Sequence, residues 1–345
     1  MVRRALQKLS MKENLTEHDA IEAMNCIMEG NATQSQIGGF LTALCFKGET
    51  VEEIVGFAKV MREKSAKVPH SLPYCIDTCG TGGDGARTFN ISTAASFVAA
   101  AAGAKIAKHG NRAMSSKSGS ADVLEALGVN IGLTPEQVGK SIEETGIGFM
   151  FAQLFHQSMK HAAGARKELG IRTVFNILGP LTNPANAKGQ LLGVFDGNIT
   201  CTMAEALKML GTERALVVHG CDGLDEITTA GATKVAELKD GIVKEYYIDT
   251  AELGIPRAEQ AELAGGDAAY NAGVIRSVLS GEKGARRNIV LVNAAAAIYV
   301  AKLADDLTEG LSIAEKMLDS GLAAAKLEEL RGFMEAAAET REVPA

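Results

Sequence analysis

The sequence predicts an α/β protein in which a small N-terminal helical domain precedes a large α/β domain with a mixed, mainly parallel sheet. Three observations support this fold class. Residues 1–68 show only helical patterns, and from Tyr74 onward short apolar strands alternate with longer helical stretches. In addition, Asp240-Gly241 separates two strand-like runs, which is typical of a β-hairpin. A chain of 345 residues is long enough for this two-part organisation.

Threonines that can cap helices mark the helical part. Thr16 stands three residues before Asp19 and Thr50 three residues before Glu53, the spacing of a capping box, and Thr33 marks a further helix start. Residues 67–70 read as a linker. We therefore expect a helical domain over residues 1–68 and the α/β domain after it.

The rest of the chain alternates between strands and helices. Helices are expected at residues 93–103 and 123–127, from Thr134, which precedes a proline and an acid, and from Asn293. Strands are expected at residues 75–78, 105–109, 214–219, 235–238, 242–248 and 289–292.

Composition and charge argue against several classes of protein. The net charge is −7 and no basic block is present, so we expect no nucleic-acid partner, because such binding depends on clustered Lys and Arg. We also expect no membrane span and no signal peptide, since residues 1–10 lack an apolar core. The six cysteines lack zinc-site spacing, and we expect reduced, buried thiols of a cytoplasmic protein at Cys26, Cys45, Cys75, Cys79, Cys201 and Cys221.

A glycine-rich loop follows the first expected strand. The run from Asp77 to Gly85 contains four glycines and a second acid, Asp84. Glycine allows positive φ and close approach of backbone N–H groups to an anion. Asp84 would repel bare phosphate unless it contacts a hydroxyl or a metal. The loop therefore favours a phosphorylated sugar.

Two further segments can complete an anion site. Residues 90–93 open the helix after the glycine loop, and they form either an ordinary N-cap or a phosphate site at a helix N-terminus. Residues 108–122 begin at a strand end, where parallel sheets bind ligands. Their hydroxyl-rich part is either a solvated loop or a functional loop that closes. Lys108 can neutralise phosphate, whereas His109 on its own would be read as a core histidine.

Two other groups suit a metal and a carboxylate. Asp225-Glu226 follows a strand, and adjacent acids near phosphate loops suit Mg²⁺, with a polar turn as the alternative. Arg166, near His156, can hold a planar carboxylate, with an ordinary surface helix as the alternative. No Ser-His-Asp set, zinc cluster or nucleophilic cysteine is evident. These features favour substitution at an activated phosphorylated substrate, driven by position and electrostatics.

Several long motifs resemble the anthranilate phosphoribosyltransferase family. They occur in the family's order, and the similarity extends over nearly the whole chain as far as residues 293–296. The motifs are Asp77 to Asp84, Asn90 to Thr93, Lys108 to Arg112, Ser118 to Asp122 and Arg172 to Pro184.

The resemblance implies a fold of the nucleoside phosphorylase and phosphoribosyltransferase type, with the site in a cleft between the two domains. Residues 173–189 would return to the helical domain, so that residues 72–172 and 190–345 form the α/β domain. It also implies a homodimer formed through the helical domains. The reaction would transfer phosphoribosyl from phosphoribosyl diphosphate (PRPP) to the amine of anthranilate, in the second step of tryptophan biosynthesis from chorismate.

The resemblance also implies roles for individual residues. The PRPP site would comprise Gly80, Gly83, Asp84, Thr88, Asn90, Ile91, Ser92, Thr93, Lys108, Ser116 and Ser120. Anthranilate would contact Gly80, His109, Asn111, His156 and Arg166. Magnesium, the implied cofactor, would be bound by Ser92, Asp225 and Glu226. No residue would act as a strong general base, because an aromatic amine is already neutral at pH 7.

Two alternatives remain open. A pyrimidine nucleoside phosphorylase would share the fold but would need a nucleobase pocket, and Asp225-Glu226 together with residues 109–122 favours PRPP instead. A catalytically silent relative that binds nucleic acid should have a basic cleft and lack the two acids. This chain is acidic and has both acids.

Overall fold

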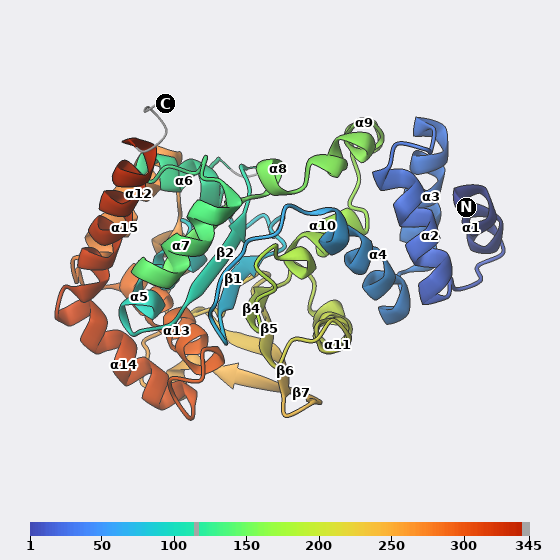
Figure 1. Ribbon diagram of the computed structural model, residues 1–345. Coiled ribbons are helices and arrows are strands. Elements are labelled where there is room, and N and C mark those ends of the chain that lie inside the picture. Colours follow the sequence, from blue (N-terminus) through green and yellow to red (C-terminus); the bar gives the residue numbers. More distant parts are fainter. Residues whose placement is uncertain (114–116, 340–345) are drawn as a thin grey trace.

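The computed structural model describes residues 1–113 and 117–339 of the chain (Figure 1). Its strands are β1 (Ile76–Gly80), β2 (Ile106–Gly110), β3 (Ile147–Phe151), β4 (Gly189–Gly193), β5 (Arg214–Gly220), β6 (Ala232–Lys239) and β7 (Ile242–Asp249). Its α-helices are α1 (Val2–Ser10), α2 (Glu17–Met28), α3 (Gln34–Lys47), α4 (Val51–Lys64), α5 (Ile91–Ala101), α6 (Ser120–Ala126), α7 (Pro135–Thr145), α8 (Ala152–Phe155), α9 (Lys160–Leu169), α10 (Phe175–Leu178), α11 (Thr200–Met209), α12 (Ala268–Leu279), α13 (Ala285–Val300), α14 (Leu307–Asp319) and α15 (Leu322–Glu339). Short 3-10 helices cover Gln157–Met159, Gly179–Thr182, Gly197–Ile199, Thr250–Leu253 and Gln260–Leu263.

The N-terminal helices begin where the capping threonines predicted. The hydroxyls of Thr16, Thr33 and Thr50 each accept the N–H three residues later, and the side chain of that later residue accepts the threonine N–H in return. Thr134 caps α7 in the same way, with Pro135 at the first helical position. These reciprocal bonds satisfy N–H groups that a helix start leaves unpaired, which is why a local pattern predicts them.

The described strands form one seven-stranded sheet in the order β3-β2-β1-β4-β5-β6-β7. The first five strands in this order are parallel, and β6 and β7 are added antiparallel at one edge. Asp240 and Gly241 join β6 to β7 with φ angles of 51° and 73°, as a tight hairpin turn requires. The mixed, mainly parallel sheet and its hairpin are therefore confirmed.

Both faces of the sheet are covered, and neighbouring residues of one strand belong to different cores. Leu191 and Leu216 pack in a core with α5, α12 and α13, whereas the next residues, Leu192 and Val217, pack with α11 and the helical bundle. This alternation follows from the two-residue period of a strand. Figure 1 shows the sheet between the bundle of α1–α4 on one side and α13–α15 on the other.

The chain returns to the helical bundle after β3. α9 lies beside α3 (Figure 1), and Ala162 and Ala165 of α9 are buried in the same core as the bundle. Phe175, Leu178 and Leu181 join this core further along the chain. Contacts with the bundle thus begin in α9, before residue 173, while the domain boundaries remain predictions.

The sheet opens between β1 and β2. These strands pair in register at a single position, whereas β1 and β4 pair along the whole of β1. The buried carboxylate of Asp77 accepts the N–H of His109 (3.1 Å) and the side-chain amide of Asn183 (2.8 Å). That amide also donates to the Ala107 carbonyl (2.8 Å). Side chains therefore replace hydrogen bonds between two strands that both lead into the predicted site.

Several predictions from the sequence were wrong. Residues 289–292 are not a strand but belong to α13, which starts at Ala285 rather than at Asn293. Residues 289–300 are all buried, and a fully buried helix lacks the polar face that separates a helical pattern from a strand. The six cysteines are free thiols, but only Cys75 is fully buried. Cys45 and Cys221 are exposed, and the other three are partly buried. β3 and β4 had no predicted counterpart.

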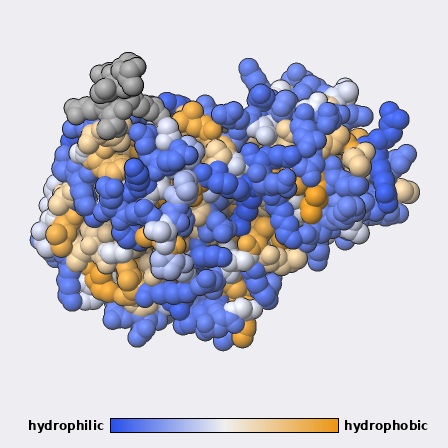
Figure 2. Space-filling model, viewed as in Figure 1, coloured by the Kyte–Doolittle hydropathy of each residue, from blue (hydrophilic) through white to orange (hydrophobic). Residues whose placement is uncertain are grey.

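The surface in Figure 2 is mainly hydrophilic, with small separate hydrophobic patches. Across the residues described, no helix is both long and apolar enough to cross a membrane. Phe46, near the end of α3, is unusual because 87% of it is exposed.

Glu53 fastens the helical bundle together. Its buried carboxylate accepts the N–H groups of Leu15 and Thr50 (2.8 Å each) and the Lys47 ammonium (2.9 Å). Glu53→Ala should lower the free energy of unfolding by about 3–5 kcal/mol, because the Lys47 charge and two N–H groups would lose their partners. Chemical denaturation checks this, with exposed Glu52→Ala as the control within about 0.5 kcal/mol of wild type. A loss below about 1 kcal/mol for Glu53→Ala would contradict the prediction.

Candidate active site

The glycine loop leaves β1 where the order of the sheet reverses. β2 and β3 lie on one side of β1, and β4 and β5 lie on the other. The loops after β1 and β4 therefore diverge, which leaves the crevice where open parallel sheets bind ligands. Gly82, Gly83 and Gly85 have φ angles of 65°, 78° and 75°, which residues with a side chain rarely adopt. The conformation of this loop depends on glycine.

Two acids reach the loop from the turn after β5. Asp225 Oδ2 accepts the N–H of Gly82 (2.8 Å), and Glu226 Oε1 accepts a backbone N–H in the first turn of α5 (3.0 Å). A Cβ atom at Gly80 would overlap the Asp225 carboxylate, and one at Gly193 would overlap the Asp225 backbone. The ends of β1 and β4 must be glycine for this turn to approach them.

Negative charge is concentrated at this turn. Burial raises the pKa of Asp225 well above its usual value, and the nearby carboxylates of Asp84 and Glu226 raise it further. Burial also raises the pKa of Glu226 to about 7 despite Lys108 and the Ser92 N–H, and Asp84 adds to the rise. Such a group of acids favours a cation, which would relieve their mutual repulsion.

A buried cation lies next to these acids. Lys108 of β2 is only 2% exposed; its Nζ donates to the Thr78 carbonyl and lies 3.4 Å from Ser92 Oγ. Burial lowers the pKa of Lys108, and Asp77 opposes that shift. The buried hydroxyl of Thr93 in the same turn of α5 has no hydrogen-bond partner among the residues that the structure describes. Because buried polar groups are normally paired, this unpaired hydroxyl at a helix N-terminus suits a ligand rich in oxygen.

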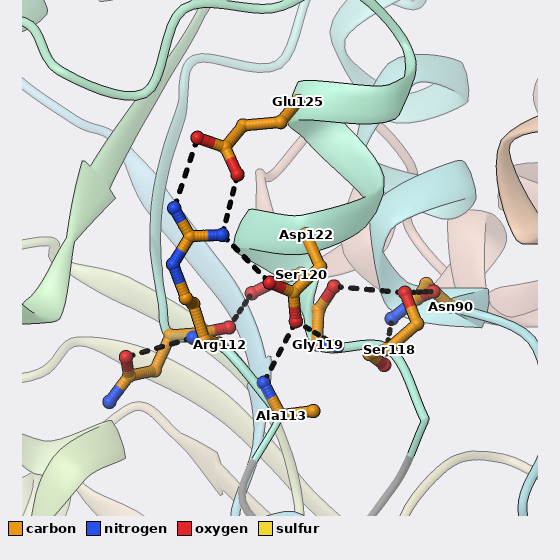
Figure 3. Close-up of polar contacts among 9 residues, drawn as sticks. Asn90, Arg112, Ala113, Ser118, Gly119, Ser120, Asp122 and Glu125 are labelled. Carbon is orange, nitrogen blue, oxygen red and sulfur yellow. Dashed lines mark hydrogen bonds and ion pairs between the residues drawn. The ribbon is translucent and has the colours of Figure 1, made fainter. Parts of the chain in front are cut away.

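One carboxylate links the two ends of the connection between β2 and α6, called here the second loop (Figure 3). Asp122 Oδ2 accepts the N–H groups of Ala113 and Gly119, each at 2.9 Å, so it joins the two ends of the loop. Asp122 Oδ1 pairs with Arg112 (2.8 Å), which also holds Glu125 through both of its terminal nitrogens. Burial would raise the pKa of Asp122, but the two N–H groups and Arg112 together hold it below its usual value.

Asn90 links the second loop to α12. Its side-chain amide donates to the Ser118 carbonyl (3.2 Å), and its Oδ1 accepts the amide of Asn271 (3.0 Å). Asn271 is buried and also accepts the N–H of Gly266 (2.7 Å). The orientation of Asn90 is therefore fixed by a residue 181 positions away, which no motif marks.

His109 and His156 form a neutral aromatic pair. Their ring centroids are 5.0 Å apart at an angle of 56°, and both side chains are buried. Burial lowers the pKa of His109 to about 3, assisted by His156, and lowers the pKa of His156 to about 4, assisted by Lys67. Neither Nε2 atom has a hydrogen-bond partner within residues 1–113 and 117–339. Neutral rings with open nitrogens suit a flat aromatic ligand with polar substituents.

Arg166 lies on α9, which Gln34 fastens to α3. The Gln34 side chain accepts the N–H of Ala165 (2.8 Å) and donates to the carbonyl of His161 (3.0 Å), two groups of the same helical turn. The half-buried Arg166 guanidinium lies 5.2 Å from the ring centroid of Phe175, and burial lowers its pKa. Within the described ranges it forms no ion pair. An arginine placed in this way is available to an anionic ligand.

Most residues predicted for the donor and the metal lie close together. The contacts above unite Gly80, Asp84, Ser92, Lys108, Asp225 and Glu226. Gly83 belongs to the glycine loop, Thr93 to the first turn of α5, and Asn90 to the link with the second loop. Thr88 lies between these segments and pairs with Ala264.

Other predicted residues are not joined to this cluster directly. The Ile91 side chain is buried in the core, so only its backbone can face a ligand. Asn111 is exposed, and its carbonyl accepts the Ser120 hydroxyl (3.4 Å). Ser116 lies outside the described residues. In the part of the chain that is described, no hydrogen bond or ring contact joins Asn111 or Arg166 to the histidine pair.

Known proteins share this arrangement of domains. Residues 3–65 match the family model described as the helical bundle domain of the glycosyl transferase family, and residues 72–324 match the model of its a/b domain. The anthranilate phosphoribosyltransferase of Acetivibrio thermocellus is 59% identical over 333 residues, which cover 96% of each chain. The chain belongs to the anthranilate phosphoribosyltransferase family.

Other members of the family are similarly close. The anthranilate phosphoribosyltransferase of Methanocorpusculum labreanum is 55% identical over 331 residues, which cover 96% of this chain and 97% of the relative. The crystal structure of the protein from Thermus thermophilus matches with a TM-score of 0.91 at 44% identity, covering 96% and 99% of the two chains. The Saccharomyces cerevisiae protein in complex with PRPP and Mg matches with a TM-score of 0.89 at 30% identity, covering 97% and 98%. The family and fold class expected from the sequence are confirmed.

Residues outside the predicted set also hold the candidate site in place. Asp77 and Asn183 lie within the recognised motifs, and a lone acid in an apolar strand was a usable signal for a buried hydrogen-bond network. Asp122 likewise belongs to a motif but had no predicted role. Asn271 and its bond to Asn90 could not have been found, because the two residues come from distant parts of the sequence.

The two buried histidines should make the protein less stable in mild acid. Their folded pKa values of about 3 and about 4 lie below the 6.5 of an unperturbed histidine, so as pH falls from 6.5 to 4 the unfolded chain binds protons that the folded chain does not. Each histidine should therefore lower the free energy of unfolding by about 1 kcal/mol between pH 7 and pH 5.5.

Urea denaturation at both pH values checks this expectation. A double variant, His109→Asn with His156→Asn, should lose about 2 kcal/mol less than wild type over that interval. The control is His18→Asn, at an exposed position, which should behave as wild type. Equal losses in wild type and in the double variant would show that the two histidines are not the cause.

Proposed function

We propose that this protein transfers the phosphoribosyl group from PRPP to the amine of anthranilate. The products are N-(5-phosphoribosyl)anthranilate and diphosphate, in the second step of tryptophan biosynthesis from chorismate. The observation that supports this proposal is the cluster of charged and polar residues at the start of α5. There, Lys108 and the unpaired Thr93 hydroxyl lie close to the acids Asp225 and Glu226. An anion cradle beside a cation site fits a metal-bound sugar diphosphate better than phosphate alone.

The donor would be held by the glycine loop, the N-terminus of α5 and the second loop. Lys108 and the hydroxyls of Ser92 and Thr93 would bind phosphate oxygens, because they lie at the N-terminus of the helix, where the helix dipole favours an anion. Asp84, beside the metal acids, would lie near the ribose and diphosphate. The other proposed donor ligands are Gly80, Gly83, Thr88, Asn90, Ile91 through its backbone, Ser116 and Ser120.

The acceptor would be held by residues around the histidine pair. Arg166 has no carboxylate partner in the described residues, so it would bind the anthranilate carboxylate through two parallel hydrogen bonds. His109 and His156 would line the path of the aromatic ring, since both are neutral at pH 7. Gly80 and Asn111 complete the proposed acceptor contacts.

Magnesium fits the turn after β5 that carries Asp225 and Glu226, called here the acidic turn. Asp225, Glu226 and the Ser92 hydroxyl offer the oxygen ligands that Mg²⁺ prefers, and the raised pKa values of both acids indicate that their charged forms need a cation nearby. No three acidic, histidine or cysteine side chains in the described ranges are arranged to hold a metal by themselves. Oxygens of PRPP and water would therefore complete its shell. When bound, the ion would neutralise charge on the diphosphate.

The reaction then depends on position and charge. The bond from the anomeric carbon to diphosphate breaks, the bond to the amine nitrogen forms, and the amine releases one proton. Lys108 and the N–H groups of α5 hold the phosphate oxygens, so the charge on the leaving group meets fixed dipoles. Arg166 aims the amine at the anomeric carbon. No strong general base is required, because the aromatic amine has a free lone pair at pH 7.

The proposed working unit is a homodimer in the cytoplasm, joined through the helical domains. Phe46 on α3 and Met11 after α1 are largely exposed apolar residues of the bundle, and such side chains suit a contact with a second copy. Six free cysteines are consistent with a reducing compartment. The proposed domains are residues 1–68 with the return at 173–189, and residues 72–172 with 190–345.

Anthranilate fluorescence provides the test of the activity. Protein mixed with magnesium, PRPP and anthranilate should remove that fluorescence, and chelating the magnesium should slow the loss by about tenfold or more, because the diphosphate charge would lose its counterion. Thymidine and uridine with phosphate serve as the control and should not be cleaved. Folded protein that leaves the fluorescence unchanged, or that cleaves either nucleoside, would rule out the proposal.

The role of Arg166 can be tested separately. Arg166→Ala should raise the anthranilate KM by roughly tenfold to hundredfold, the expected loss for a charge-assisted pair, with a much smaller effect on the PRPP KM. Steady-state kinetics with each substrate varied in turn checks this. Arg257→Ala, which breaks only an exposed pair with Asp249, should change neither KM. Equal effects of Arg166→Ala on both substrates would refute the assignment.

A further inference from the structure

Arg172 contacts the glycine loop from the segment between α9 and α10. Its Nη2 donates to the backbone carbonyl of Gly83. Its guanidinium carbon lies 4.2 Å from the ring centroid of Phe195, which follows β4. In the described residues Arg172 forms no ion pair, so its charge is directed at a backbone carbonyl and an aromatic face. That is an unusual use of an exposed arginine, because such residues more often pair with acids.

We infer that Arg172 is a positioning residue that fixes the peptide between Gly83 and Asp84 in the orientation that PRPP requires. The inference rests on the proposed assignment of the glycine loop to the PRPP diphosphate. Arg172 acts on the donor through the Gly83 carbonyl and does not itself bind the donor.

The geometry of the peptide explains why it needs fixing. In a planar trans peptide the C=O and N–H groups point in opposite directions, so a Gly83 carbonyl turned toward Arg172 leaves the Asp84 N–H directed away from Arg172. Gly82 and Gly83 both have positive φ, at 65° and 78°. These two φ angles fix the course of the loop, whereas rotation of the Gly83–Asp84 peptide changes ψ of Gly83 and φ of Asp84. Gly83 has no Cβ to restrict its ψ, and Asp is one of the few residues with a side chain that tolerate positive φ. The peptide can therefore rotate at a modest cost when nothing holds it.

A rotated peptide would harm donor binding. It would turn a carbonyl oxygen to the side on which the N–H now lies, and a carbonyl repels phosphate oxygens that an N–H would attract. Arg172 opposes this rotation because its hydrogen bond exists in one orientation only. The loop is thus preorganised before the donor arrives, which reduces the entropy that binding must overcome.

Phe195, the aromatic residue on which Arg172 packs, is itself hydrogen-bonded to the glycine loop. The Phe195 N–H donates to the Thr81 hydroxyl (3.0 Å), and the Thr81 N–H donates to the Gly193 carbonyl (2.9 Å). Arg172 therefore lies on a ring whose backbone is anchored to the start of the glycine loop. A planar guanidinium can lie on this ring while it bonds Gly83, whereas the ammonium of lysine supplies only the charge.

Arg214 offers a matched control. Its guanidinium carbon lies 4.9 Å from the ring centroid of Tyr299, and its Nη1 donates to the Tyr299 carbonyl (3.1 Å). The chemistry is the same as at Arg172, but Arg214 is the first residue of β5, at the opposite end of the strand from the acidic turn. Arg214→Met should therefore leave PRPP binding unchanged.

The experiment measures binding of magnesium–PRPP by calorimetry and both KM values by fluorescence. Arg172→Met should weaken PRPP binding and raise the PRPP KM by roughly tenfold to hundredfold, the range for a hydrogen bond to a charged group. The anthranilate KM at saturating PRPP should stay within about twofold of wild type. Arg172→Lys should recover part of the loss, and Phe195→Leu should show a smaller loss of the same kind. Thermal unfolding confirms that each variant is folded.

Several results would overturn the inference. These are an unchanged PRPP affinity in Arg172→Met, an equal rise in both KM values, or the same PRPP loss in Arg214→Met. Lys108→Met separates this inference from the proposed function. If Lys108→Met weakens PRPP binding and Arg172→Met does not, the donor site stands and only the role of Arg172 fails. If wild-type protein binds no PRPP, the proposed function fails first and the role of Arg172 fails with it.

Discussion

The arrangement of the site depends on one buried carboxylate, that of Asp77. Because it bonds the N–H of His109 and the amide of Asn183, β1 and β2 separate as they approach the site. The separation gives the Lys108 ammonium a place beside the Thr78 carbonyl. Burial raises the pKa of Asp77, yet Asn183, Lys108 and the His109 N–H all favour its charged form. Buried charges persist only where such partners satisfy them, and the opened strands provide these partners.

Charges of opposite sign alternate outward from Asp77. Lys108 lies within the electrostatic reach of Asp77 and Glu226, and both favour its protonated form against the effect of burial. Asp225 and Asp84 then add negative charge, which leaves the outermost position suited to a cation and its phosphate ligand. Groups coupled in this way do not act independently, so the loss of one alters the protonation of the next. This alternation of charge explains why the outer end of the series would bind the metal and the donor together.

The sequence predicted the local parts of this site better than the long-range supports. The glycine loop and the acids at Asp225-Glu226 could be recognised because the residue types that indicate an anion site or a metal site lie within a few positions of one another. Asn271 orients Asn90 across 181 positions, and no local pattern marks such a contact. The error at residues 289–292 has another cause, since a helix buried on every side has no polar face to reveal its period. β3 and β4 were missed because every residue of both strands is buried, so neither shows the alternation of apolar and polar residues that marks a strand with one exposed face.

The hydrogen bonds of Gln34 also show that the candidate site is built from two structural units. Gln34 attaches α9, and with it Arg166, to the helical bundle, whereas Lys108 and the acidic turn belong to the sheet. Arg166, which would bind the carboxylate of the acceptor, is thus attached to the bundle, whereas the residues that would activate the donor belong to the sheet and its loops. Changes in α3 or α9 can alter which aromatic acid is accepted without disturbing the buried charges beneath the donor. In evolutionary terms, the contact that Arg166 would make with the acceptor can change through the bundle, while the sheet residues that would bind the donor stay the same.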